Sequence, residues 1–207
     1  MSRFIVWITS TRLWGWFLLK IVPYLRLSMY YTKIRGWKYY RGYQKLEKGH
    51  VILTIDKKKL SSFIIGGKFS HAALCVDKGS EFEIAEMTQR HFTKSNFFDI
   101  CKESDHVVIG KIKSWDPDYI NAVVEKCLSF EQAKYDVRFS MDPTNELGIP
   151  QLACSELIYH SDFERRSEFN LDDVAGINRP YISPTGIFKS PHFEVVWDSN
   201  SEVRYGI

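Results

Sequence analysis

The chain has 207 residues, 44% of them hydrophobic and 26% charged, so it is long enough and apolar enough to bury the core of one domain with an appendage. This composition excludes an intrinsically disordered chain. The formal net charge is only +3, yet nine of the 28 basic residues and no acidic residue fall within residues 1–45. The other residues carry 19 basic against 25 acidic side chains, a net charge of −6, so the positive charge is concentrated in the N-terminal fifth.

Residues 4–34 are rich in apolar and aromatic side chains but are interrupted by Arg12, Lys20, Pro23 and Arg26. No apolar run is long enough to span a bilayer, and no small-residue cleavage site follows, which argues against a transmembrane helix and a secretory signal. Basic residues interleaved with Trp and Tyr are typical of a helix at the membrane interface. We therefore expect residues 1–45 to form an aromatic, basic helical extension that attaches to a membrane surface or a larger protein assembly. This expectation places the protein in the cytoplasm or at the membrane periphery.

Two alternatives for this extension remain open. The first, given equal weight, is an N-terminal helix that packs on its own domain and leaves a basic face in solvent. The second is nucleic-acid binding, because phosphates also attract clusters of cations and aromatic rings. We give the second alternative the least weight.

Residues 46–207 are expected to form the main domain, whose chain begins with a strand and alternates strands with short helices. Alternating apolar patterns between turn residues predict strands at 50–55, 70–76, 81–87, 106–113 and 193–197. The second and third of these strands flank the turn at residues 77–80 and form a hairpin. A turn at 56–59 and a short apolar helix or loop to residue 65 separate the first strand from this hairpin.

Helices are predicted at residues 96–101, from Asp116-Pro117 to Leu128, and from Cys154 to about Arg165. Cys127 falls on the apolar stripe of the second helix and is therefore expected in the core. Residues 36–43 are predicted to be a connector, residues 136–150 a loop, and residues 167–191 largely irregular.

The four cysteines, Cys75, Cys101, Cys127 and Cys154, lack the close pairing that is typical of zinc sites. We therefore expect no metal site and no cofactor. Because the cysteines are sparse and three of them lie in apolar periodic segments, reduced buried thiols are favoured over disulfides.

One cysteine and one histidine lie at positions that are typical of a cysteine nucleophile and its base. Cys154 begins a predicted amphipathic helix, and His71 begins a predicted strand. A helix N-terminus and a neighbouring imidazolium both favour the thiolate, which is the attacking form of cysteine. The backbone N–H of Cys154 could also bind a developing oxyanion, because the first amides of a helix have no intrahelical partner. Cys154 is therefore the candidate nucleophile and His71 the candidate base.

The imidazole also needs an acidic group that fixes its tautomer. The strand after His71 offers Glu86 and Glu83, which are three positions apart and so face opposite sides of a strand. Only one of them can serve, and the spacing does not choose between them.

These residues carry a resemblance to a known family. The motifs are Ser70-His71 before an apolar strand, Ile84-Ala85-Glu86-Met87 on the next strand, Tyr135-Asp136, and Ala153-Cys154-Ser155-Glu156-Leu157. Over residues 48–197 they resemble the circularly permuted papain-like cysteine hydrolases, in the YiiX/YebB-like branch of the NlpC-type superfamily, relatives of lecithin:retinol acyltransferase. The order His, acid, Cys fits the permuted topology.

The resemblance implies an α+β fold in which a small antiparallel sheet packs on the helix that carries the cysteine. It favours Glu86 over Glu83 and implies a Cys154–His71–Glu86 triad, with Tyr135, Ser70 and Ser155 beside the substrate. Tyr135 has an equal alternative as a packing residue, and neither serine is read as a nucleophile, because no Gly-x-Ser-x-Gly elbow exists. Where the family often has Gly-Asp before its first strand, this chain has Gly49-His50, so no role is carried over to position 50.

The sequence leaves three candidate functions open. The leading one is a thiol hydrolase, an amidase or peptidase, and the resemblance suggests cell-wall peptides of bacteria as substrates. The second is acyl transfer to or from lipids, which the aromatic, basic N-terminus would suit. The third is a non-catalytic docking or structural protein on a papain-like scaffold.

Overall fold

The structure is a computed structural model that describes residues 34, 36–57, 67–81, 83–88, 90–136, 142–144, 148–169, 171–173 and 180–201. Most of the predicted N-terminal extension therefore lies outside the described residues, as does the helix or loop expected to end at residue 65 and much of the predicted loop at 136–150.

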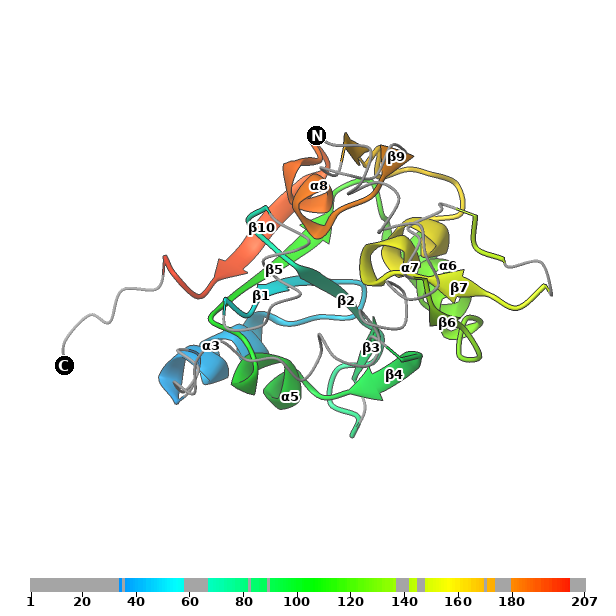
Figure 1. Cartoon of the computed structure of the whole chain (residues 1–207). Coiled ribbons are helices and arrows are strands. Elements are labelled where there is room, and N and C mark those ends of the chain that lie inside the picture. Colours follow the sequence, from blue (N-terminus) through cyan, green and yellow to red (C-terminus); the bar gives the residue numbers. More distant parts are fainter. Residues whose placement is uncertain are drawn as a thin grey trace, which may run out of the picture.

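A six-stranded antiparallel sheet lies at the centre of the fold, in the strand order β10-β5-β1-β2-β3-β4 (Figure 1). Its strands are, in chain order, β1 (Val51–Ile55), β2 (His71–Cys75), β3 (Ile84–Met87), β4 (Phe92–Ser95), β5 (His106–Ile112) and β10 (Phe193–Asp198). Two pairs of two-residue strands lie outside it: β6 (Lys134–Tyr135) with β7 (Gln151–Leu152), and β8 (Asp172–Asp173) with β9 (Pro180–Tyr181). The described residues thus form a mixed α+β fold with a mostly antiparallel sheet, as the sequence predicts.

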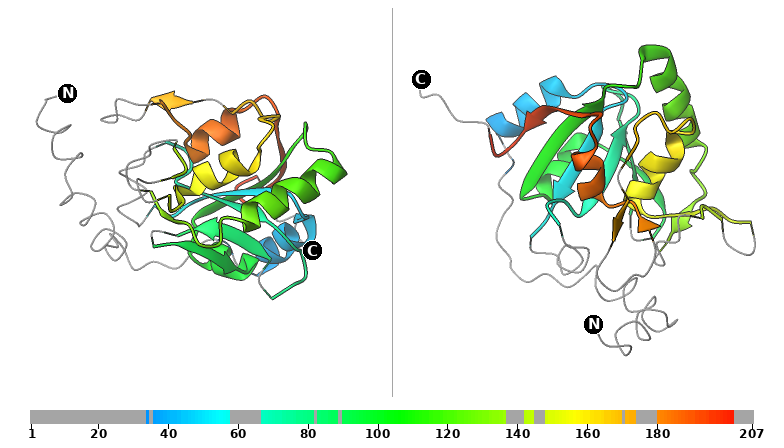
Figure 2. Two further views of the ribbon diagram at one scale, coloured as in Figure 1. Left: turned by 90° about the vertical axis from the view of Figure 1, so that its right-hand side faces the viewer. Right: turned by 90° about the horizontal axis from the view of Figure 1, so that it is seen from above.

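Helices cover both faces of this sheet (Figure 2). They are α3 (Trp37–Lys45), α5 (Phe97–Lys102), α6 (Pro117–Leu128), α7 (Cys154–Ser161) and α8 (Pro184–Lys189). Side chains of α6, α7 and α8 share one hydrophobic cluster with the sheet, and side chains of α3 and α5 share a second cluster with it. The packing of the cysteine helix on the sheet is as predicted, whereas the second helical layer is not apparent from the sequence pattern.

Burial on both faces explains why β1 begins with an unbroken apolar run, Val51-Ile52-Leu53. Val51 and Leu53 belong to the first cluster, and Ile52, between them, belongs to the second. Because successive side chains of a strand point to opposite faces, a strand covered on both sides needs apolar residues at every position.

The predicted connector at residues 36–43 is instead part of helix α3. A Cβ atom at Gly42 would lie 3.0 Å from the Trp197 ring and 3.2 Å from the Phe97 ring, so glycine allows the helix to approach the sheet closely. Tyr39 stacks on Phe97 with ring centroids 5.7 Å apart. The last residues of the predicted extension therefore pack on the body, while the division of the chain at residue 45 stays a prediction.

Two further segments differ from the prediction. Helix α7 ends at Ser161 rather than near Arg165, because Asp162 leaves helical geometry and its buried carboxylate accepts hydrogen bonds from the Tyr119 hydroxyl at 2.7 Å and the Ser167 N–H at 2.8 Å. The stretch at 167–191 contains helix α8, whose N-terminus is capped by the Ser183 hydroxyl. Pro184 at the first helical position begins that helix instead of breaking the chain.

No helix in the described part of the chain is long and apolar enough to cross a membrane.

Gly110 of β5 provides a test of how the edge of the sheet packs. A Cβ atom at Gly110 would overlap the Phe193 ring from β10. We expect Gly110→Ala to lower the free energy of unfolding by about 1–3 kcal/mol through overpacking, measured by urea denaturation.

The control is the double variant Gly110→Ala with Phe193→Ala. Removing the ring should recover part of the loss, so that the double variant is more stable than the sum of the two single effects by about 1 kcal/mol. Strictly additive effects would contradict this account of the contact.

Candidate active site

Strand register brings His71 and Glu86 together. Ala73 of β2 pairs with Glu86 of β3, which makes His71 the diagonal neighbour of Glu86 on the same side of the hairpin. His71 Nε2 lies 2.6 Å from Glu86 Oε2. The other carboxylate oxygen, Oε1, accepts a hydrogen bond from Ser95 Oγ at 2.6 Å. The carboxylate is thus held at both oxygens and orients the imidazole.

Glu83, the competing acid, has a different role. Its Oε1 accepts a hydrogen bond from the Phe97 N–H at 3.1 Å, and its Oε2 accepts one from the Gly79 N–H at 3.2 Å. Glu83 therefore joins the turn of the hairpin to the start of α5. The sequence spacing does not choose between Glu83 and Glu86, but in the structure Glu86 is the glutamate beside His71.

Cys154 is the first residue of α7, as predicted. Glu156 Oε2 accepts a hydrogen bond from the Ala153 N–H at 2.7 Å, which fixes the entry of the chain into the helix. The backbone N–H of Cys154 lies in the first turn and has no intrahelical acceptor, so it is available to an oxyanion. The positive end of the helix dipole also lies at this sulfur.

The His71 ring lies between Glu86 and Cys154. Burial alone would lower the pKa of His71. The interactions of the ring with Cys154 and Glu86 outweigh this effect and raise the pKa to about 10. The Glu86 carboxylate is thus hydrogen-bonded to the imidazole, and the Cys154 sulfur lies close enough to the same ring to raise its pKa. Strands β3 and β2 and helix α7 therefore bring the three side chains together.

The three side chains differ in exposure. Cys154 is only 1% exposed and belongs to the first hydrophobic cluster, whereas the side chain of His71 is 25% exposed. The imidazole is therefore the more accessible of these two groups, and the sulfur is covered by its neighbours.

The remaining predicted site residues lie nearby with different surroundings. Tyr135 is half-buried, and its pKa is raised well above the usual value by burial and then by Cys154 and Tyr181, which places it beside the sulfur. Ser155 is fully buried, and its hydroxyl donates to the Ile182 carbonyl at 2.6 Å, so it ties α7 to the segment before α8. The backbone N–H of Ser70 donates to the Thr54 carbonyl at 2.9 Å. Substrate contacts for these three residues stay predictions.

The other three cysteines lie apart from this chemistry. All four cysteines are buried free thiols, as predicted for the reduced chain. Burial raises the pKa of Cys75 and of Cys127 to about 12, and it also raises that of Cys101. None of these three has an imidazole among the causes of its shift, in contrast to the pairing of Cys154 with His71.

Two contacts are not predicted from the sequence. Ser95, which holds Glu86, lies on β4, a strand that was not predicted, although Phe92-Thr93-Lys94-Ser95 carries a β-type pattern. His106 is 6% exposed, and its Nε2 lies 2.7 Å from Asp198 Oδ1, 92 residues away. That pair joins β5 to β10 and is remote in sequence from the triad.

Comparison with known proteins supports the fold. No family model matches the sequence, and no curated protein matches it significantly. A solved structure described as metalloprotein yiiX from Escherichia coli O157:H7, DUF1105, superposes with a TM-score of 0.56 at 12% identity, over 74% of this chain and 97% of that one. The similarity shows a shared, yiiX-like fold.

The metal named for that protein has no counterpart among the residues described here. Within the described ranges, no group of three or more His, Cys, Asp and Glu side chains is arranged to hold a metal ion.

The raised pKa of His71 predicts a pH dependence of stability. The ring titrates near 6.5 in the unfolded chain and at about 10 in the folded one, so protonation stabilises the fold fully below pH 6.5. This stabilisation is lost as the pH rises from 6.5 towards 10. Between pH 6 and pH 9 we expect the wild type to lose about 3 kcal/mol more unfolding free energy than His71→Gln, measured by urea denaturation. Parallel pH profiles for the two proteins would contradict the assignment.

Proposed function

We propose that this protein is a cysteine hydrolase that cleaves an amide bond through an acyl-enzyme. The observation that carries the proposal is the 2.6 Å contact between Glu86 and His71, with the Cys154 sulfur close enough to the same imidazole to raise its pKa. A nucleophile, a base and an orienting acid in sequence are the arrangement that acyl transfer needs.

In the first step, Cys154 Sγ attacks the carbonyl carbon of the substrate and forms a C–S bond, while the carbonyl oxygen becomes an oxyanion. The Cys154 N–H, directed out of the first turn of α7, donates to that oxygen. The C–N bond then breaks, and the proton on His71 Nδ1 passes to the leaving amine. The product at this stage is a thioester on Cys154.

In the second step, His71 Nδ1 takes a proton from water, and the hydroxide oxygen attacks the thioester carbon. The C–S bond breaks, the carboxylic acid leaves, and the thiolate and imidazolium are restored. Glu86 stays ionised throughout and holds Nε2–H, which stabilises the imidazolium in both steps.

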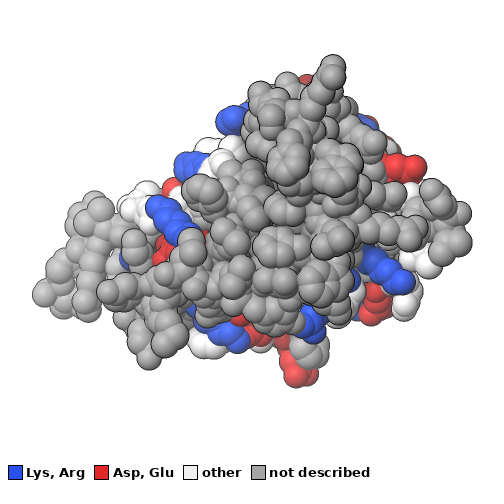
Figure 3. Space-filling view, in the orientation of Figure 1, with Lys and Arg blue, Asp and Glu red and all other residues white. Residues whose placement is uncertain are grey.

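A peptide is the substrate class we favour, with cell-wall peptides suggested by the family resemblance. On the face in Figure 3, the described Lys and Arg side chains are interspersed with Asp and Glu around the rim. The described charged side chains on this face thus form no patch of one sign.

Acyl transfer on lipids is the second candidate, because one described surface suits a bilayer. Tyr40 on α3 is 60% exposed and Phe98 on α5 is 57% exposed, and Phe98 contacts Tyr39 edge to face at 5.8 Å. Lys38 and Arg41 lie over the Trp37 ring at 5.9 and 5.8 Å. Exposed rings beside cations fit a peripheral attachment to anionic lipid, where lipid substrates reside, or to a larger assembly.

The test is the acyl adduct on Cys154. After incubation with muropeptides or with phospholipid vesicles and an acid quench, intact-mass and peptide spectra should show an acyl group on Cys154, and Cys154→Ala should show none. An adduct from muropeptides alone supports the amidase, and one from lipid alone supports the acyltransferase. Absence of an adduct with both, together with equal iodoacetamide labelling of all four thiols, would leave the non-catalytic scaffold and reject the proposal.

The paired variants Glu86→Gln and Glu83→Gln test the orienting acid. Glu86→Gln should slow adduct formation by about 100-fold or more, because the neutral amide neither supports the imidazolium nor fixes its tautomer. Glu83→Gln, which alters a structural carboxylate, should keep the rate within about threefold of wild type. Equal rates in the two variants would exclude Glu86 from the chemistry.

A further inference from the structure

Residues 182–185 connect the two segments that carry the candidate nucleophile and its base. They comprise the end of the chain before α8 and the start of that helix, and they are buried. Helix α8 lies beside α7 (Figure 2). Hydrogen bonds join this segment to α7 next to Cys154 and to the chain next to His71.

The Thr185 hydroxyl makes the connection towards His71. Thr185 Oγ1 accepts hydrogen bonds from the backbone N–H of Lys68 at 3.0 Å and of Phe69 at 3.1 Å, and it donates to the Phe69 carbonyl at 3.3 Å. A hydroxyl has one proton and two lone pairs, so these three bonds use its whole capacity. They hold the backbone just before His71, where strand β2 begins.

Gly67 shows how closely these two segments approach. A Cβ atom at Gly67 would lie 2.5 Å from Thr185 Oγ1, and the φ of 82° is in the left-handed region that favours glycine. The fully buried ring of Phe69 also packs on Phe188 of α8, with ring centroids 5.1 Å apart. A hydroxyl and an aromatic contact thus fix the entry to β2 against α8.

The Ser155 hydroxyl makes the connection towards Cys154. Ser155 is fully buried in the first turn of α7, and its Oγ donates to the Ile182 carbonyl at 2.6 Å. The Ser183 hydroxyl then caps α8 by accepting a hydrogen bond from the Gly186 N–H at 2.8 Å. Ile182 and Thr185 are therefore held on either side of one capped turn.

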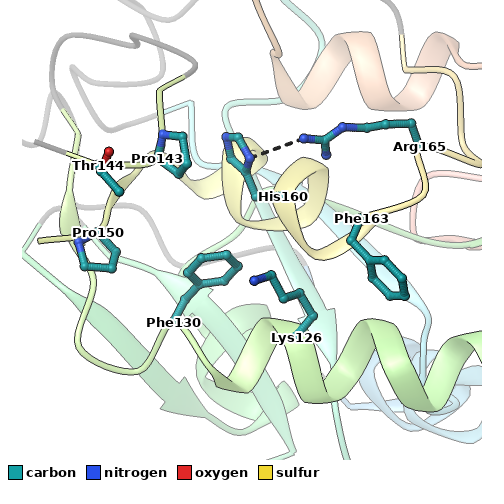
Figure 4. Close-up of a pocket in the computed structure, with 8 residues that line it drawn as sticks. All are labelled: Lys126, Phe130, Pro143, Thr144, Pro150, His160, Phe163 and Arg165. Carbon is teal, nitrogen blue, oxygen red and sulfur yellow. Dashed lines mark hydrogen bonds between the residues drawn. The ribbon is translucent and has the colours of Figure 1, made fainter. Parts of the chain in front are cut away.

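The opposite end of α7 borders a separate pocket. This pocket has a volume of about 360 Å³ and is lined there by His160, by Arg165 beyond the helix and by Lys126 of α6 (Figure 4). Neither β2 nor residues 182–185 contribute to its lining, and the three residues of the candidate triad are also outside it. Contacts at this end of α7 therefore do not relate the sulfur to the imidazole.

We propose that two hydroxyls, that of Thr185 and that of Ser155, belong to positioning residues of the candidate active site. Linked through residues 182–185, they set the distance between the sulfur of Cys154 and the ring of His71. The inference rests on the proposed function, in which that sulfur and that ring act together. Proton transfer needs the two groups within hydrogen-bond reach, and a displacement of about 1 Å can slow a reaction about 100-fold.

The test removes each hydroxyl with little change in side-chain shape. Thr185→Val and Ser155→Ala should each slow formation of the acyl adduct on Cys154 about 10- to 100-fold, because the sulfur and the ring are no longer held in place. Thr185→Ser, which keeps the hydroxyl, should stay within about threefold of wild type. Nitrogen-15 NMR of the His71 ring gives a second readout that needs no substrate. In Thr185→Val and Ser155→Ala the midpoint of its titration should fall by about one pH unit or more, because the ring loses the neighbouring sulfur.

The matched control is Ser190→Ala. Ser190 follows the last residue of α8, is 4% exposed, and donates to the Ser167 carbonyl at 2.7 Å. This change removes a buried hydroxyl from the other end of the same helix, so the adduct rate and the His71 midpoint should match wild type. Urea denaturation separates loss of fold from loss of position. If Thr185→Val does not fold, Ser155→Ala carries the same prediction.

The double variant Thr185→Val with Ser155→Ala tests whether both hydroxyls act through one segment. Once the connection is broken at one end, breaking the other end adds little. The double variant should therefore be slower than the slower single variant by no more than about threefold. Independent effects would multiply, to about 100-fold or more.

Two results would overturn the proposal: His71 midpoints in the single variants that match that of Ser190→Ala, or effects that multiply in the double variant. Failure of the proposed function is a different result. A wild type that forms no adduct, with a His71 midpoint that still falls in Thr185→Val, would reject the hydrolase and support the positioning of the ring.

Discussion

The hydrogen bond between His71 and Glu86 is the constraint on which the candidate site depends. A strand register places the two residues diagonally across β2 and β3, and a slip of one position would turn Glu86 to the other face. Ser95 of β4 then holds the second carboxylate oxygen. With the ring so oriented, its other nitrogen is directed at the residue that begins α7. Three adjacent strands and one helix therefore determine a single side-chain geometry.

The layers around the sheet make this geometry rigid. Helices α6, α7 and α8 share one cluster with the sheet and α3 and α5 the other, so the strands that carry His71 and Glu86 are packed from both sides. The two glutamates of the hairpin have separate tasks: Glu83 holds the turn and α5, and Glu86 holds the imidazole. The turn and the imidazole thus have separate carboxylate partners. The same helix α7 also carries His160 at its other end, where the separate pocket lies.

Much of this arrangement could be predicted from local chemistry. The β-pattern after Gly49 and around His71, the Asp116-Pro117 start of α6 and the position of Cys154 at a helix N-terminus are all read from short stretches, and each lies where it was expected. The pairing of His71 with an acid on the next strand follows from a hairpin with an identifiable turn. The choice of Glu86 required either the family resemblance or the register itself.

Contacts between distant segments could not be predicted in this way. The helical state of residues 37–45 depends on Trp197 and Phe97, which lie far along the chain, and the role of Ser95 depends on a strand only four residues long. The burial of Cys154 and the unpartnered Nε2 of His160 arise from packing among several elements. The hydrophobic periodicity of a segment indicates whether it forms a helix or a strand, but it does not indicate which other elements pack against it.

The most direct measurement of the central claim is the protonation state of the His71 ring. Nitrogen-15 NMR of the histidine side chains at pH 8, with His71→Gln to assign the signal, reports whether each ring nitrogen carries a proton. The account predicts protons on both nitrogens of His71, held by Glu86 on one side and Cys154 on the other. A neutral His71 ring at that pH, with one bare nitrogen, would contradict it.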